Sequence, residues 1–354
     1  MEDKKLKDKY KKKFSKKLNN MSILLSHGDG GFKTSQLINE TISRYIKNDI
    51  LEKLEDSAIF NTVTKKIAFT TDSFVIDPIF FPGGDIGKLS ICGTINDLMT
   101  SGCKPYALSL SLILEEGFPI KVLEKILKSI KETIAEVTQV KIVTGDTKVV
   151  GKGFVDKIYI NTAGIGFIDK DIEMSPKKIK AGDIILINGT IAEHGIVILS
   201  QREEFNFKTD LKSDCSPLNF LVEDMISESK EIHALRDATR GGIARVLIEL
   251  AESSKTDIEI NEKQIPIKRE TNGICQFLGM DPLYIANEGK IIAFVAEKDA
   301  KKVINVMKKN KYGKDSQIIG KVLKKGSGIV ILNTMIGTKR ILDLHYSEQL
   351  PRIC

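Results

Sequence analysis

Apolar residues recur along the chain in two spacings, which predict alternating strands and helices. Short apolar runs of the kind that form buried strands cover residues 23–25, 58–61, 67–76, 107–114, 140–143 and 158–167. A helix with one apolar face is predicted by Val122, Leu123, Ile126, Leu127, Ile130 and Ile134. Another helix is expected from about residue 86 to residue 100. The first half of the chain therefore mixes helices and strands.

The second half restarts this alternation after a stretch rich in lysine. Residues 175–182 contain proline, glycine and three lysines, a composition typical of a domain boundary. An apolar run at 184–187 follows, and helices and strands alternate to about residue 344. One of these helices is predicted by Ile243, Val246, Leu247, Leu250 and Ala251. We therefore expect two α/β domains, at 21–170 and 171–344, with an extension at 1–20 and a tail at 345–354.

The net charge of +7 comes almost entirely from the first 20 residues. They hold nine lysines against three acidic residues, so the rest of the chain is nearly neutral and does not indicate nucleic-acid binding. Leu6, Tyr10, Phe14 and Leu18 form a thin apolar stripe on this lysine-rich segment. The stripe fits contact with an anionic membrane or an acidic partner, and it equally fits a solvated or frayed helix. The segment lacks the continuous apolar region of a secretory signal.

Five cysteines indicate a reduced compartment rather than a disulfide or zinc framework. They are Cys92, Cys103, Cys215, Cys275 and Cys354, and no two form a C-x-x-C pair. Without an export signal we expect a cytoplasmic protein, in which the first four cysteines serve packing. Cys354 differs because it is the last residue of the sequence. The eight residues that end there can span at most about 28 Å, so they could carry its thiol between two sites.

Two short segments in the first 80 residues carry candidate chemistry. His27, Gly28, Asp29, Gly30 and Gly31 form a glycine-rich loop that would let the backbone approach phosphates, or that simply makes a tight turn. Asp72 interrupts an apolar strand, where it could hold Mg²⁺ or make a strand-end turn.

Two further segments place polar groups among apolar ones. Asn96 and Asp97 lie in an otherwise apolar helix, where they need partners, either a metal or nucleotide or a capping network. Asp146, Thr147 and Lys148 lie between apolar flanks, and an ion pair or a contact with phosphate or metal would explain them.

The second half carries two more candidates. Residues 235–242 contain Asp237 between two arginines and lead into a helix that Thr239 could cap, and a helix start attracts anions. Glu288 opens an acid–glycine–lysine segment that could be a charged turn. The chain has no P-loop and no protein-kinase motif set, so use of ATP would require a different nucleotide-binding fold.

Taken in order, these segments resemble the HypE family, the carbamoyl dehydratases of nickel–iron hydrogenase assembly. The strings that carry the resemblance are 27–31, 71–75, 80–87, 92–97, 145–150, 235–242, 288–290 and the terminal Pro-Arg-Ile-Cys. The resemblance runs from about residue 23 to Cys354. Asp29 stands where the family often has Ser or Gly, and Ala238 replaces a frequent Pro.

The resemblance implies a two-domain fold like that of aminoimidazole ribonucleotide synthetase. In that superfamily, which includes selenophosphate synthetase and thiamine-monophosphate kinase, an N-terminal α/β domain binds ATP and forms a homodimer through its strands. A C-terminal α/β domain closes over the nucleotide. The implied partners are a HypF-like carbamoyltransferase, which loads the tail, and a HypC–HypD-like scaffold, which receives the product.

The resemblance also implies roles for single residues. Cys354 would carry a carboxamide that ATP-dependent dehydration turns into a thiocyanate, the source of cyanide for iron. Mg²⁺ would be bound by Asp72, Asp97 and Asp237. Nucleotide would be contacted by His27, Gly28, Gly30, Gly31, Asn96, Asp146 and Thr147. Lys148 and Glu288 would lie beside the carboxamide, with Glu288 as a candidate base.

Two other classes of function remain open at this stage. A related ATP-dependent synthetase or small-molecule kinase would share the fold and its acidic sites. A selenophosphate synthetase is expected to carry Cys or selenocysteine near the first glycine loop, and no cysteine precedes Cys92. A carrier that merely ferries a group on Cys354 would have no use for the acids near the glycine loops.

Overall fold

The computed structural model describes residues 22–24, 37–46, 48, 66–169, 171–202, 209–343 and 352–354. Several predictions fall outside these ranges: the lysine-rich segment 1–20, the loop with His27, Gly28, Gly30 and Gly31, the strand at 58–61 and most of the tail. Of the strand expected at 23–25, the structure describes Ile23 and Leu24, which belong to no strand, and the adjacent Ser22 makes an isolated bridge to Pro119. No helix within the described ranges is long and apolar enough to cross a membrane.

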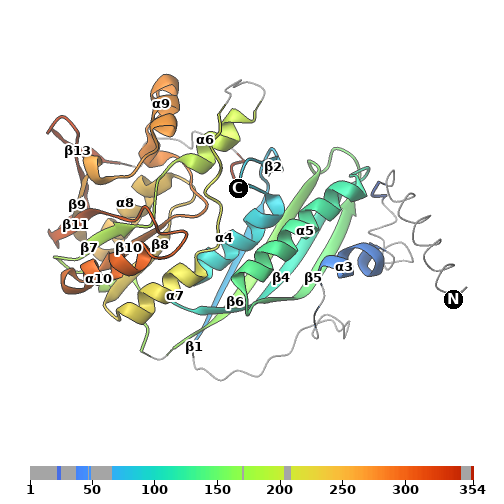
Figure 1. Cartoon of the computed structure of the whole chain (residues 1–354), viewed down its shortest axis with the longest axis horizontal. Coiled ribbons are helices and arrows are strands. Elements are labelled where there is room, and N and C mark those ends of the chain that lie inside the picture. The colour runs from blue at the N-terminus through green and yellow to red at the C-terminus, as the bar shows by residue number, and fades with distance from the viewer. Residues whose placement is uncertain are drawn as a thin grey trace, which may run out of the picture.

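A four-stranded sheet forms the first half of the molecule. Its strands run in the order β1 (Lys66–Phe74), β6 (Ile158–Ile168), β4 (Lys104–Glu115) and β5 (Lys141–Val150), antiparallel except for the β4–β5 pair. Helices α4 (Ile86–Thr100) and α5 (Ile120–Val137) cover one face of this sheet (Figure 1). A small pair, β2 (Phe80–Phe81) and β3 (Gly84–Asp85), precedes α4, and η2 (Ile38–Ile42) and α3 (Ser43–Tyr45) lie nearer the N-terminus.

A seven-stranded sheet forms the second half, in the order β13-β12-β9-β11-β7-β10-β8. The strands are β7 (Ile184–Ile187), β8 (Ile232–Asp237), β9 (Thr256–Asn261), β10 (Ile291–Val295), β11 (Gln317–Lys325), β12 (Val330–Asn333) and β13 (Lys339–Leu342). The helices are α6 (Glu193–Ser200), α7 (Asn219–Glu228), α8 (Gly242–Ser254), α9 (Arg269–Leu278) and α10 (Glu297–Met307). Three short helices, η4 (Pro176–Lys178), η5 (Glu262–Gln264) and η6 (Pro282–Tyr284), join them.

The predicted amphipathic helices form because their apolar faces fill the core. In α5, Leu123, Ile126, Leu127 and Ile130 are all fully buried, as their spacing predicts. The carboxylate of Asp85 accepts hydrogen bonds from two main-chain N–H groups in the first turn of α4, which fixes where that helix begins. The helices expected at 86–100, around 122–134 and around 243–251 are confirmed.

Strand β5 is longer than the sequence suggested. The run at 140–143 predicts a short strand, whereas β5 continues to Val150 through the Gly-Asp-Thr-Lys segment. Parallel pairing with β4 carries it onward, with Gly145 opposite Leu110 and Lys148 opposite Ile113. Pairing with a neighbouring strand outweighs the local preference of glycine and aspartate for a turn.

Helix α4 lies where the two halves of the molecule meet. It packs on β1 and β6 of the first sheet and also contacts β8 and α7 of the second half. Residues on α4 can therefore face side chains from both sheets at once, which determines the place of the candidate site.

Candidate active site

Three aspartates from three separate elements converge beside α4. Asp72 belongs to β1, Asp97 to the last turns of α4, and Asp237 ends β8. Thr70 Oγ1 donates to Asp97 at 2.9 Å, and Thr94 Oγ1 donates to Asp72 at 3.4 Å. These two threonines orient the carboxylates of Asp97 and Asp72. Because Asp237 comes from the second sheet, the cluster joins both halves of the chain.

Burial and mutual repulsion make this cluster hold protons at neutral pH. Desolvation, followed by the charge of Asp97, raises the pKa of Asp72 to about 7. The same two causes raise the pKa of Asp237 to about 7. A cation that binds these carboxyl groups neutralises their repulsion and readily displaces their protons.

Glu288 lies in the same interior and has an unusual environment. It is 3% exposed, and its Oε1 atom has no hydrogen-bond partner among the residues that the structure describes. Burial raises its pKa well above the usual value, and the nearby charges of Cys215, Asp214, Asp237 and Asp72 add to that effect. A buried acid with an unpaired oxygen is typical of a group kept for chemistry rather than for packing.

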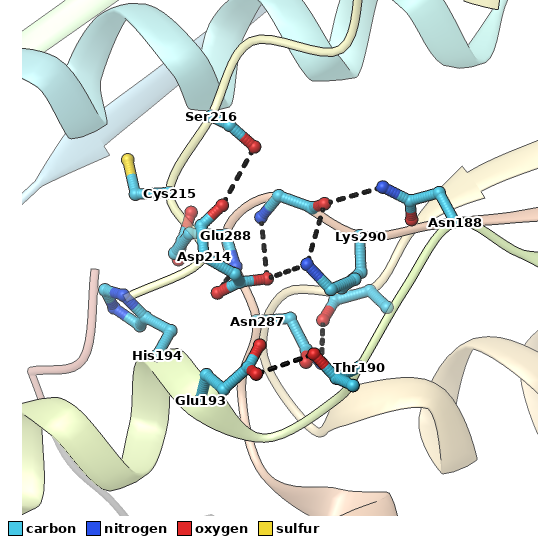
Figure 2. Close-up of polar contacts among 12 residues, drawn as sticks. Asn188, Thr190, Glu193, His194, Asp214, Cys215, Ser216, Asn287, Glu288 and Lys290 are labelled. Atoms are coloured by element: carbon cyan, nitrogen blue, oxygen red, sulfur yellow. Dashed lines mark hydrogen bonds and ion pairs between the residues drawn. The ribbon is translucent and has the colours of Figure 1, made fainter. Parts of the chain in front are cut away.

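The backbone of Glu288 is held by a second buried acid, Asp214. The Asp214 carboxylate accepts from the N–H groups of Glu288 and Gly289, at 3.1 Å each, and lies 3.0 Å from Lys290 Nζ (Figure 2). Burial alone would raise the pKa of Asp214, but the Lys290 ammonium outweighs it and holds the pKa below its usual range. A Cβ on Gly289 would lie 2.0 Å from the carbonyl oxygen of Asp214, so only glycine fits this position.

Asn96 joins this segment to α4. Its Nδ2 donates to the carbonyl oxygens of Ser216, at 3.1 Å, and of Glu288, at 3.3 Å. Its Oδ1 accepts from the N–H group of Leu218 at 2.8 Å. The amide thus fixes the segments that carry Glu288 and Asp214, and its expected contact with nucleotide stays a prediction.

The end of the chain lies between the two halves. The N–H group of Val75 donates to the carbonyl oxygen of Cys354 at 3.0 Å, and that of Asp77 donates to Arg352 at 3.3 Å. The three residues therefore extend alongside the chain that follows β1, and Figure 1 shows the C-terminal end close to β2. Ile353 is 4% exposed and belongs to the core, whereas Cys354 is half-buried.

Contacts from both halves hold this end in place. From the first half, Asp156 forms an ion pair with Arg352 at 2.8 Å. From the second half, Arg202 donates to the carbonyl oxygen of Arg352 at 3.1 Å, and His194 Nε2 lies 2.7 Å from the carbonyl oxygen of Ile353.

Other predicted site residues lie elsewhere on the first sheet. Asp146 and Lys148 form an exposed ion pair at 3.0 Å on β5. The strand register puts Gly145 in the same row as Asp72, so the neighbouring Asp146 and Lys148 occupy the opposite face of the sheet. Thr147 shares the helix-covered face with Gly145. Within one chain, therefore, the structure does not bring Lys148 and Asp146 to the aspartate cluster.

One expected helix cap is wrong. The residue that caps α8 is Gly241, and no side chain provides a capping hydrogen bond, so Thr239 does not cap this helix. Instead the carbonyl oxygen of Thr239 accepts from the N–H group of Gly242, because Gly241 and Gly242 both adopt positive φ angles of 74° and 62°.

Sequence reasoning missed Asp214 and His194. Asp214 lies in a short Ser-Asp-Cys-Ser segment without periodicity, and its partners are more than 70 residues away in the chain. His194 is the second residue of an otherwise largely apolar helix, where a lone histidine gives no sign of a distant partner.

Comparison with known families finds a match in both halves. Residues 54–168 match the family described as AIR synthase related protein, N-terminal domain, and residues 180–333 match its C-terminal domain. Carbamoyl dehydratase HypE of Escherichia coli K12 is 43% identical over 338 residues, covering 94% of this chain and 99% of that protein. Its counterpart in Azotobacter vinelandii is 41% identical, covering 95% and 98% respectively.

Solved structures give the same result. A hydrogenase maturation protein HypE in complex with ATP superposes with a TM-score of 0.90 at 42% identity, covering 94% of this chain and all of that one. A HypE chain from a HypE–HypF complex has a TM-score of 0.76 at 46% identity, covering 87% and 99%. Thiamine monophosphate kinase from Aquifex aeolicus, with a TM-score of 0.59 at 20% identity and coverage of 82% and 96%, shares the fold alone.

Proposed function

This chain belongs to the HypE family of carbamoyl dehydratases within the AIR synthase related proteins, and on that premise we propose that it dehydrates a carboxamide carried on its own Cys354. The observation that carries the proposal is the meeting of two parts. A cluster of acids lies between the two halves, with Asp72, Asp97 and Asp237 half-buried and Glu288 buried, and the segment ending in Cys354 is docked between the same halves. A substrate held on the tail can therefore reach a site built from both domains.

ATP is the proposed co-substrate, and Asp72, Asp97 and Asp237 are the residues that would hold Mg²⁺, which would supply positive charge beside the phosphates. A relative of this chain has been solved with ATP. No three His, Cys, Asp or Glu side chains in the described part of the chain form a ready-made metal cage. This fits Mg²⁺, which usually takes only one or two carboxylates and completes its shell with phosphate oxygens and water. The raised pKa values of Asp72 and Asp237 fit as well, because a dication would offset the repulsion that raises them.

The chemistry turns an amide oxygen into a leaving group. The thiolate of Cys354 first accepts a carbamoyl group. The carboxamide oxygen then attacks the γ-phosphorus of ATP, the bond to ADP breaks, and one N–H proton is lost. Next the C–O bond breaks, phosphate leaves, and the second N–H proton is lost, which gives S–C≡N. Bound Mg²⁺ would neutralise charge on the transferring phosphoryl group.

Glu288 is the proposed acceptor of a proton from the carboxamide nitrogen. Burial, with smaller contributions from nearby charges that include Asp237 and Asp72, raises the pKa of Glu288 well above its usual value and so favours the protonated acid. A cation bound by those aspartates lowers the pKa of Glu288 towards the working pH, where a carboxylate is most effective as a base. Lys148 remains the second candidate for a group beside the carboxamide. Since it lies on the exposed side of the sheet, Lys148 of a partner chain packed on that side would be the one to approach the site.

Intact-protein mass spectrometry tests the proposed function. The chain is incubated with carbamoyl phosphate, Mg-ATP and a HypF-like carbamoyltransferase. We expect a carbamoyl adduct that converts to a cyano adduct on Cys354, and neither adduct with Cys354→Ala. Phosphorylation of a small metabolite by Cys354→Ala at the parent rate would favour a small-molecule kinase instead.

Further proposals concern partners and location. A HypE–HypF complex is known for a relative that is 46% identical, so we expect a HypF-like enzyme to load Cys354. A HypC–HypD-like scaffold would take up the cyano group. The chemistry needs a reduced thiol and cytosolic ATP, which favours the cytoplasm.

A homodimer is proposed through the open face of the four-stranded sheet. Phe69 and Ile67 on β1 and Tyr106 on β4 are exposed there, with Phe69 at 69%, and Tyr106 packs against Phe167. An apolar patch of this kind indicates an interface. Phe69→Lys should shift the molar mass measured by light scattering from dimer to monomer, while the surface variant Phe277→Lys, on α9 in the other half, should leave it unchanged.

A further inference from the structure

The hydrogen bonds from the second half to the docked end of the chain are to main-chain carbonyl oxygens, one from Arg202 and one from His194. This histidine is fully buried at the start of α6. Its Nε2 atom lies 2.7 Å from the carbonyl oxygen of Ile353, the residue before the reactive cysteine. The Phe81 and His194 rings pack nearly perpendicular to each other, with 5.4 Å between the ring centroids, which restricts the orientation of the imidazole.

The partners of His194 define which nitrogen carries hydrogen. A carbonyl oxygen can only accept, so Nε2 must donate to Ile353. On the other side Nδ1 lies 2.7 Å from Ser213 Oγ, which itself accepts from the N–H group of Cys215 at 3.1 Å. The hydroxyl of Ser213 can therefore donate to Nδ1. Burial lowers the pKa of His194, against the opposing charge of Asp214, so the neutral ring fits both contacts.

These contacts connect the tail to the segment that positions Glu288. Ser213 and Cys215 flank Asp214, whose carboxylate holds the N–H groups of Glu288 and Gly289. Figure 2 shows His194, Asp214, Cys215 and Glu288 gathered around this segment. The carbonyl oxygen before Cys354 and the backbone of Glu288 are thus fixed to one stretch of three residues.

We propose that His194, oriented by Ser213, is a positioning residue that clamps the main chain next to Cys354 and so sets the reactive sulfur relative to Glu288. The catalytic role of the clamp rests on the proposed function. The clamp itself can be measured without the dehydration reaction. Because the contact is to a carbonyl oxygen, this hydrogen bond depends on the position of the main chain and not on the identity of the side chain at residue 353. Any substitute at position 194 that keeps a donor where Nε2 lies should preserve it.

Four variants separate the clamp from ordinary packing. His194→Met fills the space without a donor, whereas His194→Gln keeps an N–H donor at about the reach of Nε2. Ser213→Ala leaves the ring in place but removes the group that orients it. His233→Gln is the matched control, because His233 is also buried in the second half, where its ring nitrogens lie 2.8 Å from Asp183 and 3.4 Å from Glu231 rather than beside residues 352–354.

The readout is the rate at which iodoacetamide alkylates Cys354, followed by mass spectrometry of the C-terminal peptide in the full-length chain. The other four cysteines are buried, so Cys354 is the thiol whose exposure the docked tail controls. Loss of one buried hydrogen bond should raise the alkylation rate of His194→Met by roughly tenfold. We expect His194→Gln and His233→Gln to stay near the parent rate and Ser213→Ala to lie between.

Two results would overturn the clamp: parent-like alkylation of His194→Met, or equally fast alkylation of His194→Gln and His194→Met. If His194→Met does not fold, as judged by its thermal unfolding, Ser213→Ala decides in its place, and a parent-like rate there counts against the proposal. Alkylation requires neither ATP nor carbamoyl phosphate. A parent chain that never forms the cyano adduct would therefore refute the proposed function while the clamp is judged separately.

Discussion

Protons held by the aspartate cluster give the sharpest test of the proposed nucleotide and magnesium site. Asp72 and Asp237 each have a pKa of about 7, because they are buried beside Asp97. The pair should hold about one proton in total at pH 7 and nearly two at pH 6. A dication that both carboxylates contact must displace these protons, so binding should strengthen as the pH rises.

The size of the effect follows from the two pKa values. If both carboxyls must ionise, binding of Mg-ATP is weakened about 4-fold at pH 7 and about 120-fold at pH 6, relative to high pH. The association constant should therefore rise about 30-fold between pH 6 and pH 7, and only about threefold from pH 7 to pH 8. The steep part of the curve lies below neutral pH because that is where both groups are protonated.

Isothermal titration calorimetry in buffers of different ionisation enthalpy counts the protons directly. The nucleotide is added already saturated with Mg²⁺, and the slope of the measured enthalpy against buffer enthalpy gives the protons released. We expect about two at pH 6, about one at pH 7 and close to none at pH 8. Asp97→Asn should release fewer at pH 7, because it removes a charge that adds to burial in raising both pKa values. Asp281→Asn, whose parent carboxylate pairs with Arg340 on the surface, should match the parent.

A parent protein that binds Mg-ATP at pH 6 without releasing protons would refute this reasoning. The same holds for an affinity that is flat between pH 6 and pH 7. In either case the cation does not contact both Asp72 and Asp237, or their protonation differs from what their burial implies.

Three further predictions concern Glu288, its support and the tail. Glu288→Gln should slow formation of the cyano adduct by about 100-fold or more in single-turnover mass spectrometry, with Mg-ATP binding in calorimetry unchanged; cyano formation at the parent rate would exclude a proton-transfer role. Asp214→Asn should lower the free energy of unfolding in urea by about 3 kcal/mol, because it leaves the buried Lys290 ammonium unpaired, and adding Lys290→Met should recover part of the loss; equal stability of the single and double variants would contradict this account. Asp156→Asn removes a partly exposed partner of Arg352, worth about 0–1 kcal/mol, so alkylation of Cys354 should rise by less than about fivefold and the difference from the parent should shrink in high salt; a larger rise would mean that this ion pair, rather than the main-chain contacts, holds the tail.

The sequence by itself determined the local elements and the motifs. The apolar spacing of residues 122–134 could only be buried as a helix, and α5 confirms it. The apolar surroundings of Asn96 and Asp97 placed them within a buried helix, which α4 confirms. The ordered motifs also identified the family, because each depends on residues that are neighbours in the chain.

What the sequence could not give was the meeting of residues far apart. The interpretation of Asp72 alone left a strand-end turn open, and only the packing of α4 between β1 and β8 shows it facing two other acids. The apolar run at 140–143 predicted a strand that stops before the Gly-Asp-Thr-Lys segment, and pairing with β4 continues the strand through that segment. The functional roles of these residues stay predictions.

Asp214 and His194 were missed for the same physical reason. Asp214 and His194 matter through backbone groups that lie 74 and 159 residues away, at Glu288 and Ile353. Periodicity and capping report interactions within a few residues, where the chain itself fixes the geometry. Desolvation, the pKa values that it shifts and the hydrogen bonds between distant segments depend on which surfaces are packed together, and only the tertiary structure decides that.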